Sequence, residues 1–144
     1  MTPRSAALQR VITFYETLDQ SAIARISQVY RDDAFFKDPF NQVSGAAEIA
    51  RIFEHMFVQV DAPRFVVLEA VEQDRVAFLT WEFRFRMKRF DTVTLQVIRG
   101  ATHLQFADDG RVQHHRDYWD AAEELYEKLP LLGGLMRWLK RQAG

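Results

Sequence analysis

Residues 75–89 read RVAFLTWEFRFRMKR, and apolar and polar side chains alternate along this stretch. Alternation with period two is typical of a β-strand with one buried face. Two more long strands are expected beside it, at about 64–72 and 92–106. The turn signal Asp109-Gly110 then predicts a hairpin into a last strand at 111–119. These segments together predict a meander of long antiparallel strands. The apolar face of residues 75–89 comprises Ala77, Leu79, Trp81, Phe83, Phe85 and Met87.

The residues before this meander have helical spacing instead. Apolar side chains recur every three or four residues in three segments, which predicts helices at 5–18, about 21–30 and 46 to about 60. A short strand is expected at 34–37, because Pro39 follows and stops it. Helices followed by a strand meander favour an α+β roll, in which a curved antiparallel sheet wraps around the N-terminal helices. Such a roll leaves a cone-shaped pocket at its mouth.

Length and composition fit one globular domain, residues 1–144, with 125–144 as a C-terminal helical extension. The chain has 144 residues, 48% of them hydrophobic, and its 19 basic residues nearly balance 20 acidic ones. This balance gives no reason to expect a nucleic-acid partner. No cysteine is present, so disulfides and thiolate chemistry are excluded. No apolar run is long enough to span a membrane, so a cytoplasmic protein is expected. No metal-ligand spacing is evident, and neither a cofactor nor a metal is expected.

Asp38 is the first candidate for chemistry. Residues 30–41 read YRDDAFFKDPFN, which sets this carboxylate among aromatic side chains. A carboxylate in apolar surroundings can exchange a proton at neutral pH. The alternative is a turn residue before Pro39 whose oxygens accept backbone N–H donors. Both interpretations stay open at this point.

The order of elements, together with four short motifs, resembles the nuclear-transport-factor-like superfamily, and within it the bacterial ketosteroid isomerases and the SnoaL-like polyketide cyclases. The resemblance covers roughly residues 5–122. The motifs are Asp32-Asp33-Ala34, Asp38-Pro39-Phe40, the turn Asp109 to Val112, and Tyr118-Trp119. The resemblance implies a cystatin-like roll, a catalytic base at Asp38 and a homodimer.

The isomerase pattern is incomplete in this chain. The resemblance places Phe14 where the isomerases have an oxyanion-hole tyrosine, and Thr102 where they have a neutral acid. Phe14 cannot donate a hydrogen bond, and a hydroxyl is a much weaker acid than a carboxylic acid. Tyr15 is the next residue, but a one-residue step turns a side chain by about 100° around a helix, so Tyr15 is not expected to replace it. These departures argue against a steroid isomerase.

The last strand provides a second candidate group. The resemblance implies that Trp119 lines the pocket, and period two then places Asp117 and His115 on the same inner face. An imidazole beside a carboxylate is an acid–base pair suited to neutral pH. In the SnoaL-like cyclases and the related epoxide hydrolases, an aspartate in this region acts as acid or base. The alternative is a structural pair, or side chains turned to solvent by a bulge.

These observations predict a cofactor-free isomerase, cyclase or dehydratase that acts by acid–base chemistry on a hydrophobic small molecule. Asp38, His115 and Asp117 are the expected catalytic residues. The alternatives are a non-catalytic ligand-binding or dimerising module on the same fold, and a structural dimer with a closed pocket. A homodimer is also favoured by the apolar segment 125–144 and by the exposed sheet face. The expected pocket lining comprises Phe14, Tyr30, Phe53, Trp81, Phe83, Thr102 and Trp119.

Overall fold

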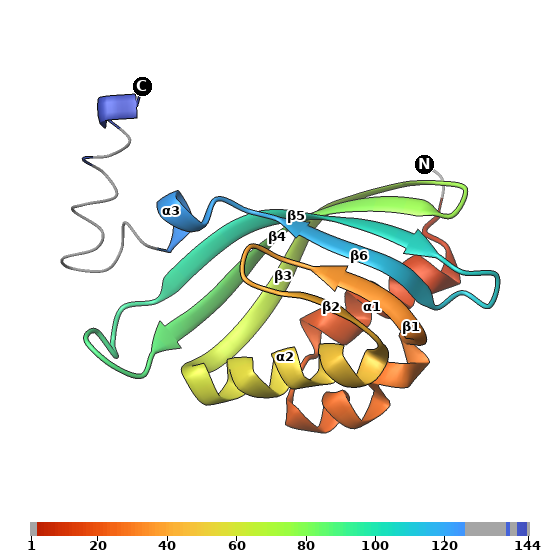
Figure 1. Cartoon of the computed structure of the whole chain (residues 1–144), viewed down its shortest axis with the longest axis horizontal. Helices are drawn as coiled ribbons and strands as arrows, with labels where there is room; N and C mark the ends of the chain where they lie inside the picture. The colour runs from red at the N-terminus through yellow and green to blue at the C-terminus, as the bar shows by residue number, and fades with distance from the viewer. Residues whose placement is uncertain (1–2, 126–137, 139–140, 144) are drawn as a thin grey trace.

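A single curved sheet with the N-terminal helices on one side makes up the fold (Figure 1). The computed structural model describes residues 3–125, 138 and 141–143, so nearly all of the predicted extension 125–144 lies outside the described residues. The helices are α1 (Ala6–Glu16), the 3-10 helix η1 (Gln20–Gln28), α2 (Ala46–Gln59) and the short α3 (Ala121–Glu124). The strands are β1 (Tyr30–Lys37), β2 (Gln42–Ser44), β3 (Val60–Gln73), β4 (Val76–Met87), β5 (Gln96–Phe106) and β6 (Val112–Tyr118).

The sheet has six strands in the order β2-β1-β6-β5-β4-β3 and does not close into a barrel. The pairs along β3, β4, β5 and β6 are antiparallel, as the meander predicts. The pair β1–β6 is parallel, which differs from an all-antiparallel sheet. At the start of this pair, Val112 donates its backbone N–H to the carbonyl of Val29, the residue after η1. The α+β roll is confirmed, with one parallel junction between its first and last long strands.

Several elements differ from the sequence predictions, and β3, for example, begins at Val60 rather than at about residue 64. The second helix is a 3-10 helix that ends at Gln28, and β1 begins at Tyr30 rather than at residue 34. The strand β2, which pairs with the end of β1, is too short to give a periodic signal. The strand β5 begins at Gln96 instead of residue 92, because the Asp91 carboxylate accepts the backbone N–H groups of Val93 and Thr94 and holds a turn there.

The helix α1 is fixed at its start to the far edge of the sheet. Ser5 is its N-cap, and the Ser5 hydroxyl oxygen accepts the backbone N–H of Leu8 at 3.1 Å. The same hydroxyl donates to Glu72 of β3 at 2.8 Å. Leu8, Val11, Ile12, Phe14 and Tyr15 are then buried against the sheet. The contacts of Ser5 therefore fix the start of α1, and the buried side chains of this helix pack in the middle of the fold.

The core lies between the helices and the inner face of the sheet, and it contains polar groups. Its fully buried members include Leu8, Ile12, Ile49 and Leu104, but also Tyr30 and His115. Thr102 is buried as well. Buried polar side chains need hydrogen-bond partners, and the partners of these three residues are described with the site below.

Within the described part of the chain, no helix has the length and apolar character needed to cross a membrane.

Candidate functional site

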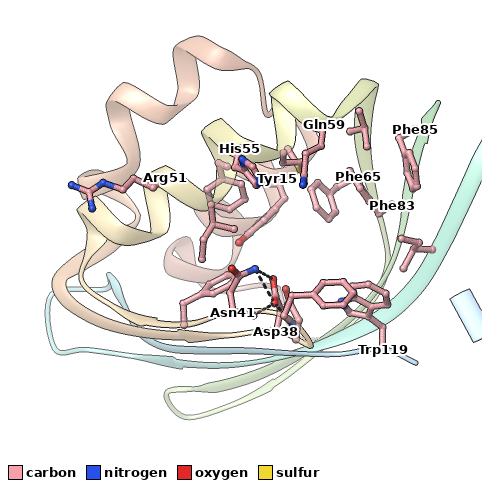
Figure 2. Close-up of a pocket in the computed structure, with 18 of the residues that line it drawn as sticks. Tyr15, Asp38, Asn41, Arg51, His55, Gln59, Phe65, Phe83, Phe85 and Trp119 are labelled. Carbon is pink, nitrogen blue, oxygen red and sulfur yellow. Dashed lines mark hydrogen bonds between the residues drawn. The ribbon is translucent and has the colours of Figure 1, made fainter. Parts of the chain in front are cut away.

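A cavity of about 590 Å³ lies between α2 and the inner face of the sheet (Figure 2). Its walls are mostly aromatic and aliphatic. The helix α2 adds Glu48 and Arg51, which form an ion pair at 2.7 Å, and also His55 and Gln59. Asp38, Asn41 and Asp117 supply the other polar groups. A volume of this size accommodates a small organic molecule. The aromatic wall is formed by Tyr15, Phe36, Phe40, Phe53, Phe65, Trp81, Phe83, Phe85 and Trp119.

The strand β6 turns His115 and Asp117 to the inner face of the sheet. Nε2 of His115 lies 2.7 Å from Oδ1 of Asp117. The imidazole is only 1% exposed, whereas the Asp117 side chain is 18% exposed and lines the cavity. The structure thus brings the two residues together as a pair whose carboxylate meets the cavity while the imidazole lies behind it. The bulge that would turn them to solvent is not present at these positions.

The next strands hold the carboxylate from the other side. Thr102, the register partner of Asp117 on β5, donates its hydroxyl to Asp117 Oδ1 at 2.6 Å. The Trp81 indole Nε1–H of β4 donates to the Thr102 hydroxyl oxygen at 2.7 Å. The indole lies across Gly100, where an added Cβ would come within 2.5 Å of the ring. A glycine at this position therefore allows Trp81 to reach Thr102.

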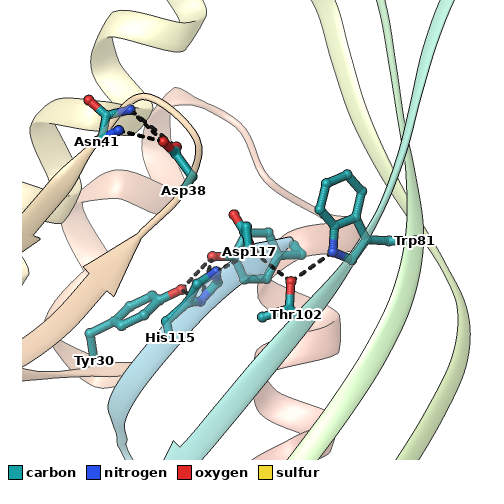
Figure 3. A network of polar contacts seen from close by, with 8 residues as sticks. Tyr30, Asp38, Asn41, Trp81, Thr102, His115 and Asp117 are labelled. Atoms are coloured by element: carbon teal, nitrogen blue, oxygen red, sulfur yellow. Dashed lines mark hydrogen bonds and ion pairs between the residues drawn. The ribbon is translucent and has the colours of Figure 1, made fainter. Parts of the chain in front are cut away.

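Two tyrosines complete the group behind the imidazole (Figure 3). The Tyr30 hydroxyl lies 2.9 Å from His115 Nδ1, and it is hydrogen-bonded to the Tyr15 hydroxyl, which lies 3.5 Å from the same nitrogen. Burial, followed by the charges and hydrogen bonds around it, raises the pKa of Tyr15 well above its usual value, and burial also raises the pKa of Tyr30. Both phenols therefore remain protonated at neutral pH. We call the series Trp81, Thr102, Asp117, His115, Tyr30 and Tyr15 the polar relay.

Asp38 lies apart from the polar relay, as Figure 3 shows. Its Oδ1 accepts the backbone N–H of Phe40 at 2.8 Å, the backbone N–H of Asn41 at 2.7 Å and the Asn41 side-chain amide at 3.1 Å. Its backbone N–H donates to the Asn41 carbonyl at 2.9 Å. This is the turn geometry that the Asp-Pro sequence favours. Asp38 also lines the cavity, so a catalytic role for it stays a prediction.

The other predicted lining residues fall into three groups. Phe53, Trp81, Phe83 and Trp119 line the large cavity. Thr102 lines a small neighbouring cavity of about 20 Å³, together with His115 and Asp117. Phe14 and Tyr30 line neither cavity: Tyr30 belongs to the polar relay, and the Phe14 ring packs edge-on against Tyr15, Tyr30 and Phe53.

Tyr15 is the member of the polar relay that sequence reasoning did not expect in the site. It lines both cavities, and in Figure 2 its ring enters from α1 with the hydroxyl oxygen on the side of Asp38 and Asn41. The resemblance to the isomerases directed attention to Phe14 instead. The signal was present in the helical spacing, since Leu8, Val11, Ile12 and Tyr15 form one stripe on α1. This stripe faces the core, and Tyr15, its last residue within α1, lies at the site.

The acid groups of the site are not arranged as a metal centre. Among residues 3–125, 138 and 141–143, no three His, Asp or Glu side chains come close enough together to hold a metal ion. What the arrangement offers is a carboxylate at an apolar cavity, backed by an imidazole and two phenols. Such groups can accept, hold and donate protons.

Comparison with known families and structures gives consistent results. A family model for the SnoaL-like domain matches residues 11–115. No curated protein sequence matches the chain. Many solved structures share the fold, and three of them are described next; their low sequence identity makes them evidence for the fold alone.

The first is a hypothetical protein with a ketosteroid isomerase-like fold from Catenulispora acidiphila DSM 44928, in complex with trimethylamine. It has 12% identity and a TM-score of 0.70, over 87% of this chain and 92% of that one. The second, an NTF2-like protein of unknown function from Burkholderia pseudomallei K96243, has 16% identity and a TM-score of 0.71, over 83% and 95% of the two chains. The third, a candidate SnoaL-like polyketide cyclase from Shewanella putrefaciens CN-32, has 16% identity and a TM-score of 0.70, over 85% and 98%.

Proposed function

The chain belongs to the SnoaL-like domain family of the NTF2-like superfamily, and we propose that it is an enzyme that moves a proton within a hydrophobic small molecule. Isomerisation, cyclisation and dehydration share this step, and none of them needs a redox cofactor. The proposal keeps the predicted pair His115 and Asp117 and assigns the role of base to Asp117. Asp38 orients the ligand from its turn at the cavity wall.

One observation carries the proposal: the two oxygens of Asp117 differ. Oδ1 accepts hydrogen bonds from Thr102 and from His115. Oδ2 has no hydrogen-bond partner among the described residues, and the side chain lines the cavity. Three N–H groups already occupy Oδ1 of Asp38, and its Oδ2 accepts the Asn41 amide at 3.1 Å. Asp117 is therefore the better placed of the two carboxylates to take a proton from a ligand.

The chemistry follows from this placement. Asp117 Oδ2 takes a proton from a carbon beside a carbonyl group of the ligand; the C–H electron pair forms a C=C bond, and the carbonyl π pair moves to the oxygen. The Tyr15 hydroxyl lines the cavity, and we assign to it the hydrogen bond that stabilises the resulting oxyanion. Return of the proton from Asp117 to another atom of the same ligand completes an isomerisation. His115 and Thr102 hold Oδ1 and so fix the plane of the carboxylate throughout.

Related structures support a ligand-binding cavity in this fold. One relative was crystallised with trimethylamine, and another is a candidate polyketide cyclase. Nine aromatic residues line the cavity here, which suits a ligand with planar or cyclic apolar parts. The same walls favour the alternative function, a carrier that binds such a molecule without changing it.

Deuterium exchange distinguishes the two functions. We would follow the α-protons of 2-tetralone in D₂O by proton NMR, with wild-type protein and with Asp117→Asn, Asp38→Asn and Tyr118→Phe. Asparagine keeps the Oδ1 acceptor but removes the base, so Asp117→Asn should slow enzymatic exchange by roughly 10²–10⁴-fold. Tyr118→Phe, on the outer face of β6, should not change it.

The pair of carboxylate variants makes the test decisive. If Asp38→Asn abolishes exchange and Asp117→Asn does not, the base is Asp38 and our assignment is wrong. If wild-type protein binds the ketone but causes no exchange above buffer, the chain is a binding module.

We also propose that the outer face of the sheet binds a second copy of the chain. Val71 and Phe78 are register partners on this face and are both exposed. Phe78 stacks on His103, which contacts His114 on the next strand. This apolar and aromatic row supports the predicted homodimer. Sedimentation should show a dimer that Phe78→Lys converts to a monomer; a wild-type monomer at all concentrations would contradict the proposal.

A further inference from the structure

The hydrogen-bond directions in the polar relay are fixed at one end. An indole N–H can only donate, so the Thr102 oxygen accepts from Trp81 and the Thr102 proton must point to Asp117 Oδ1. Oδ1 is therefore an acceptor, and it also faces His115 Nε2 at 2.7 Å. Nε2 must then carry a proton. The structure thereby determines which nitrogen of His115 is protonated when the ring is neutral.

The remaining nitrogen, Nδ1, decides the direction of the two phenols. In a neutral ring Nδ1 has no proton and accepts the Tyr30 O–H across 2.9 Å. The Tyr30 oxygen then accepts the Tyr15 O–H, since these hydroxyls are hydrogen-bonded to each other. The Tyr15 hydroxyl consequently donates its proton to Tyr30 and not toward the cavity. Toward the cavity it presents only the lone pairs of its oxygen.

Protonation of Nδ1 reverses both bonds. The imidazolium donates to the Tyr30 oxygen, the Tyr30 proton turns to the Tyr15 oxygen, and the Tyr15 proton is free to point into the cavity. No heavy atom has to move. We propose that His115 sets the hydrogen-bonding character of Tyr15, so that the cavity takes up a proton when it binds an apolar molecule through an anionic phenolate or enolate oxygen.

The surroundings of His115 make the charged form possible. The Asp117 carboxylate at 2.7 Å balances an imidazolium, so the pair remains neutral as a whole. The Phe36 ring stacks on the imidazole with centroids 4.6 Å apart, and Leu104 of β5 is its uncharged register partner. The titratable groups nearby are Tyr15 of α1, Tyr30 of β1, Asp38 after β1, and Asp117, His114 and Arg116 of β6, of which His114 and Arg116 point to the outer face.

A ligand that arrives as a neutral phenol or enol gives the same final state. Its O–H proton passes to the Tyr15 oxygen, the Tyr15 proton passes to Tyr30, and the Tyr30 proton passes to His115 Nδ1. Each of the two tyrosine oxygens loses one proton and gains one, so the only net change is a proton moved from the ligand to the imidazole. The product is a ligand oxyanion that accepts from Tyr15, with the imidazolium beside Asp117. High pKa values of the two phenols favour this outcome, because neither remains as a phenolate.

The inference concerns the cavity of the proposed function but needs no chemical step on carbon. It therefore also applies to a non-catalytic binding protein. If the ketone exchange fails and the coupled uptake succeeds, the enzyme proposal is wrong and this inference stands. If the ketone exchange succeeds and the coupled proton uptake fails, the enzyme proposal stands and the inference about proton coupling is wrong.

The test uses 4-nitrophenol, whose phenolate absorbs visible light, at a pH where the free probe is ionised and free imidazole is neutral. Calorimetric titration in buffers with different ionisation enthalpies counts the protons that binding takes up. Wild-type protein should take up one proton per phenolate, and its Kd should therefore rise as the pH rises. Tyr30→Phe removes the hydroxyl that joins His115 to Tyr15 and leaves only the 3.5 Å approach of Tyr15 to Nδ1, so the uptake should fall well below one proton. Tyr118→Phe should behave as wild type.

Nitrogen NMR of labelled histidine gives a direct second reading. On addition of phenolate, the Nδ1 signal of His115 should move from that of an unprotonated nitrogen to that of an imidazolium. Tyr15→Phe should abolish this change, and it replaces Tyr30→Phe if that variant does not fold. Phenolate binding without proton uptake, uptake that persists in both phenylalanine variants, or no detectable binding of the probe would each overturn the proposal.

Discussion

Tyr30→Phe tests how much of the stability depends on the polar relay. The Tyr30 ring is 0% exposed and phenylalanine retains it, so the substitution removes only the hydroxyl. That hydroxyl makes two hydrogen bonds, one with Tyr15 and one with His115 Nδ1. Each buried hydrogen bond contributes about 1 kcal/mol, and an unpaired Nδ1 costs about as much again.

The Tyr15 hydroxyl lies 3.5 Å from the same nitrogen and can take over part of this role. We therefore expect the free energy of unfolding to fall by about 2 kcal/mol, which lowers Tm by roughly 6 °C for a chain of this length. Urea denaturation followed by tryptophan fluorescence measures the loss, with an unchanged m-value as evidence that the fold is kept.

Tyr118→Phe is the matched control. Its side chain is 48% exposed, its ring keeps the contact with Arg116, and its unfolding free energy should change by less than about 0.5 kcal/mol. If Tyr30→Phe costs no more than this control, the hydroxyl does not stabilise the core, and the relay as described here is wrong.

Three further substitutions test other parts of the fold. Gly100→Ala sets a Cβ within 2.5 Å of the Trp81 ring, so we expect a loss of about 1–3 kcal/mol and altered tryptophan fluorescence; an unchanged spectrum would show that the indole does not lie across β5. Ser5→Ala removes the N-cap and the hydroxyl's hydrogen bond to Glu72 but keeps the backbone N–H bond to Glu72, and should lower the unfolding free energy by about 1 kcal/mol in urea, whereas Ser5→Thr should lose less. His114→Gln addresses pH: burial, then nearby cations, lowers the His114 pKa in the folded state below 6.5, so the unfolded chain binds the proton first and wild-type stability is lost as pH falls below about 6.5. The Tm of His114→Gln should fall less over that range, and parallel curves for the two proteins would contradict the assignment.

Local patterns predicted the parts of the structure that depend on neighbouring residues. The alternation in residues 75–89 identified β4, because a strand with one buried face needs only its own side-chain period. The same parity placed His115 and Asp117 on one face of β6. The Asp-Pro sequence favoured the turn at Asp38 that the structure contains.

Interactions between distant segments could not be obtained in this way. The parallel pairing of β1 with β6 has no local signal, and without it Tyr30 has no reason to be near His115. Tyr15 shows a different kind of error. The resemblance to another family selected Phe14, whereas the helical stripe of this chain selected Tyr15, and the local periodicity was the better guide.

The pairing of β1 with β6 also bears on when the protein becomes competent during its synthesis. Tyr30 and His115 are 85 residues apart, and Tyr15 and His115 are 100 apart. Contacts over such separations form late in folding, because the entropy lost in closing the loop must be offset by contacts already made. On the ribosome, both tyrosines are available long before His115 exists. The last strand to be made therefore completes the acid–base group, and a chain that stops before β6 lacks both His115 and Asp117.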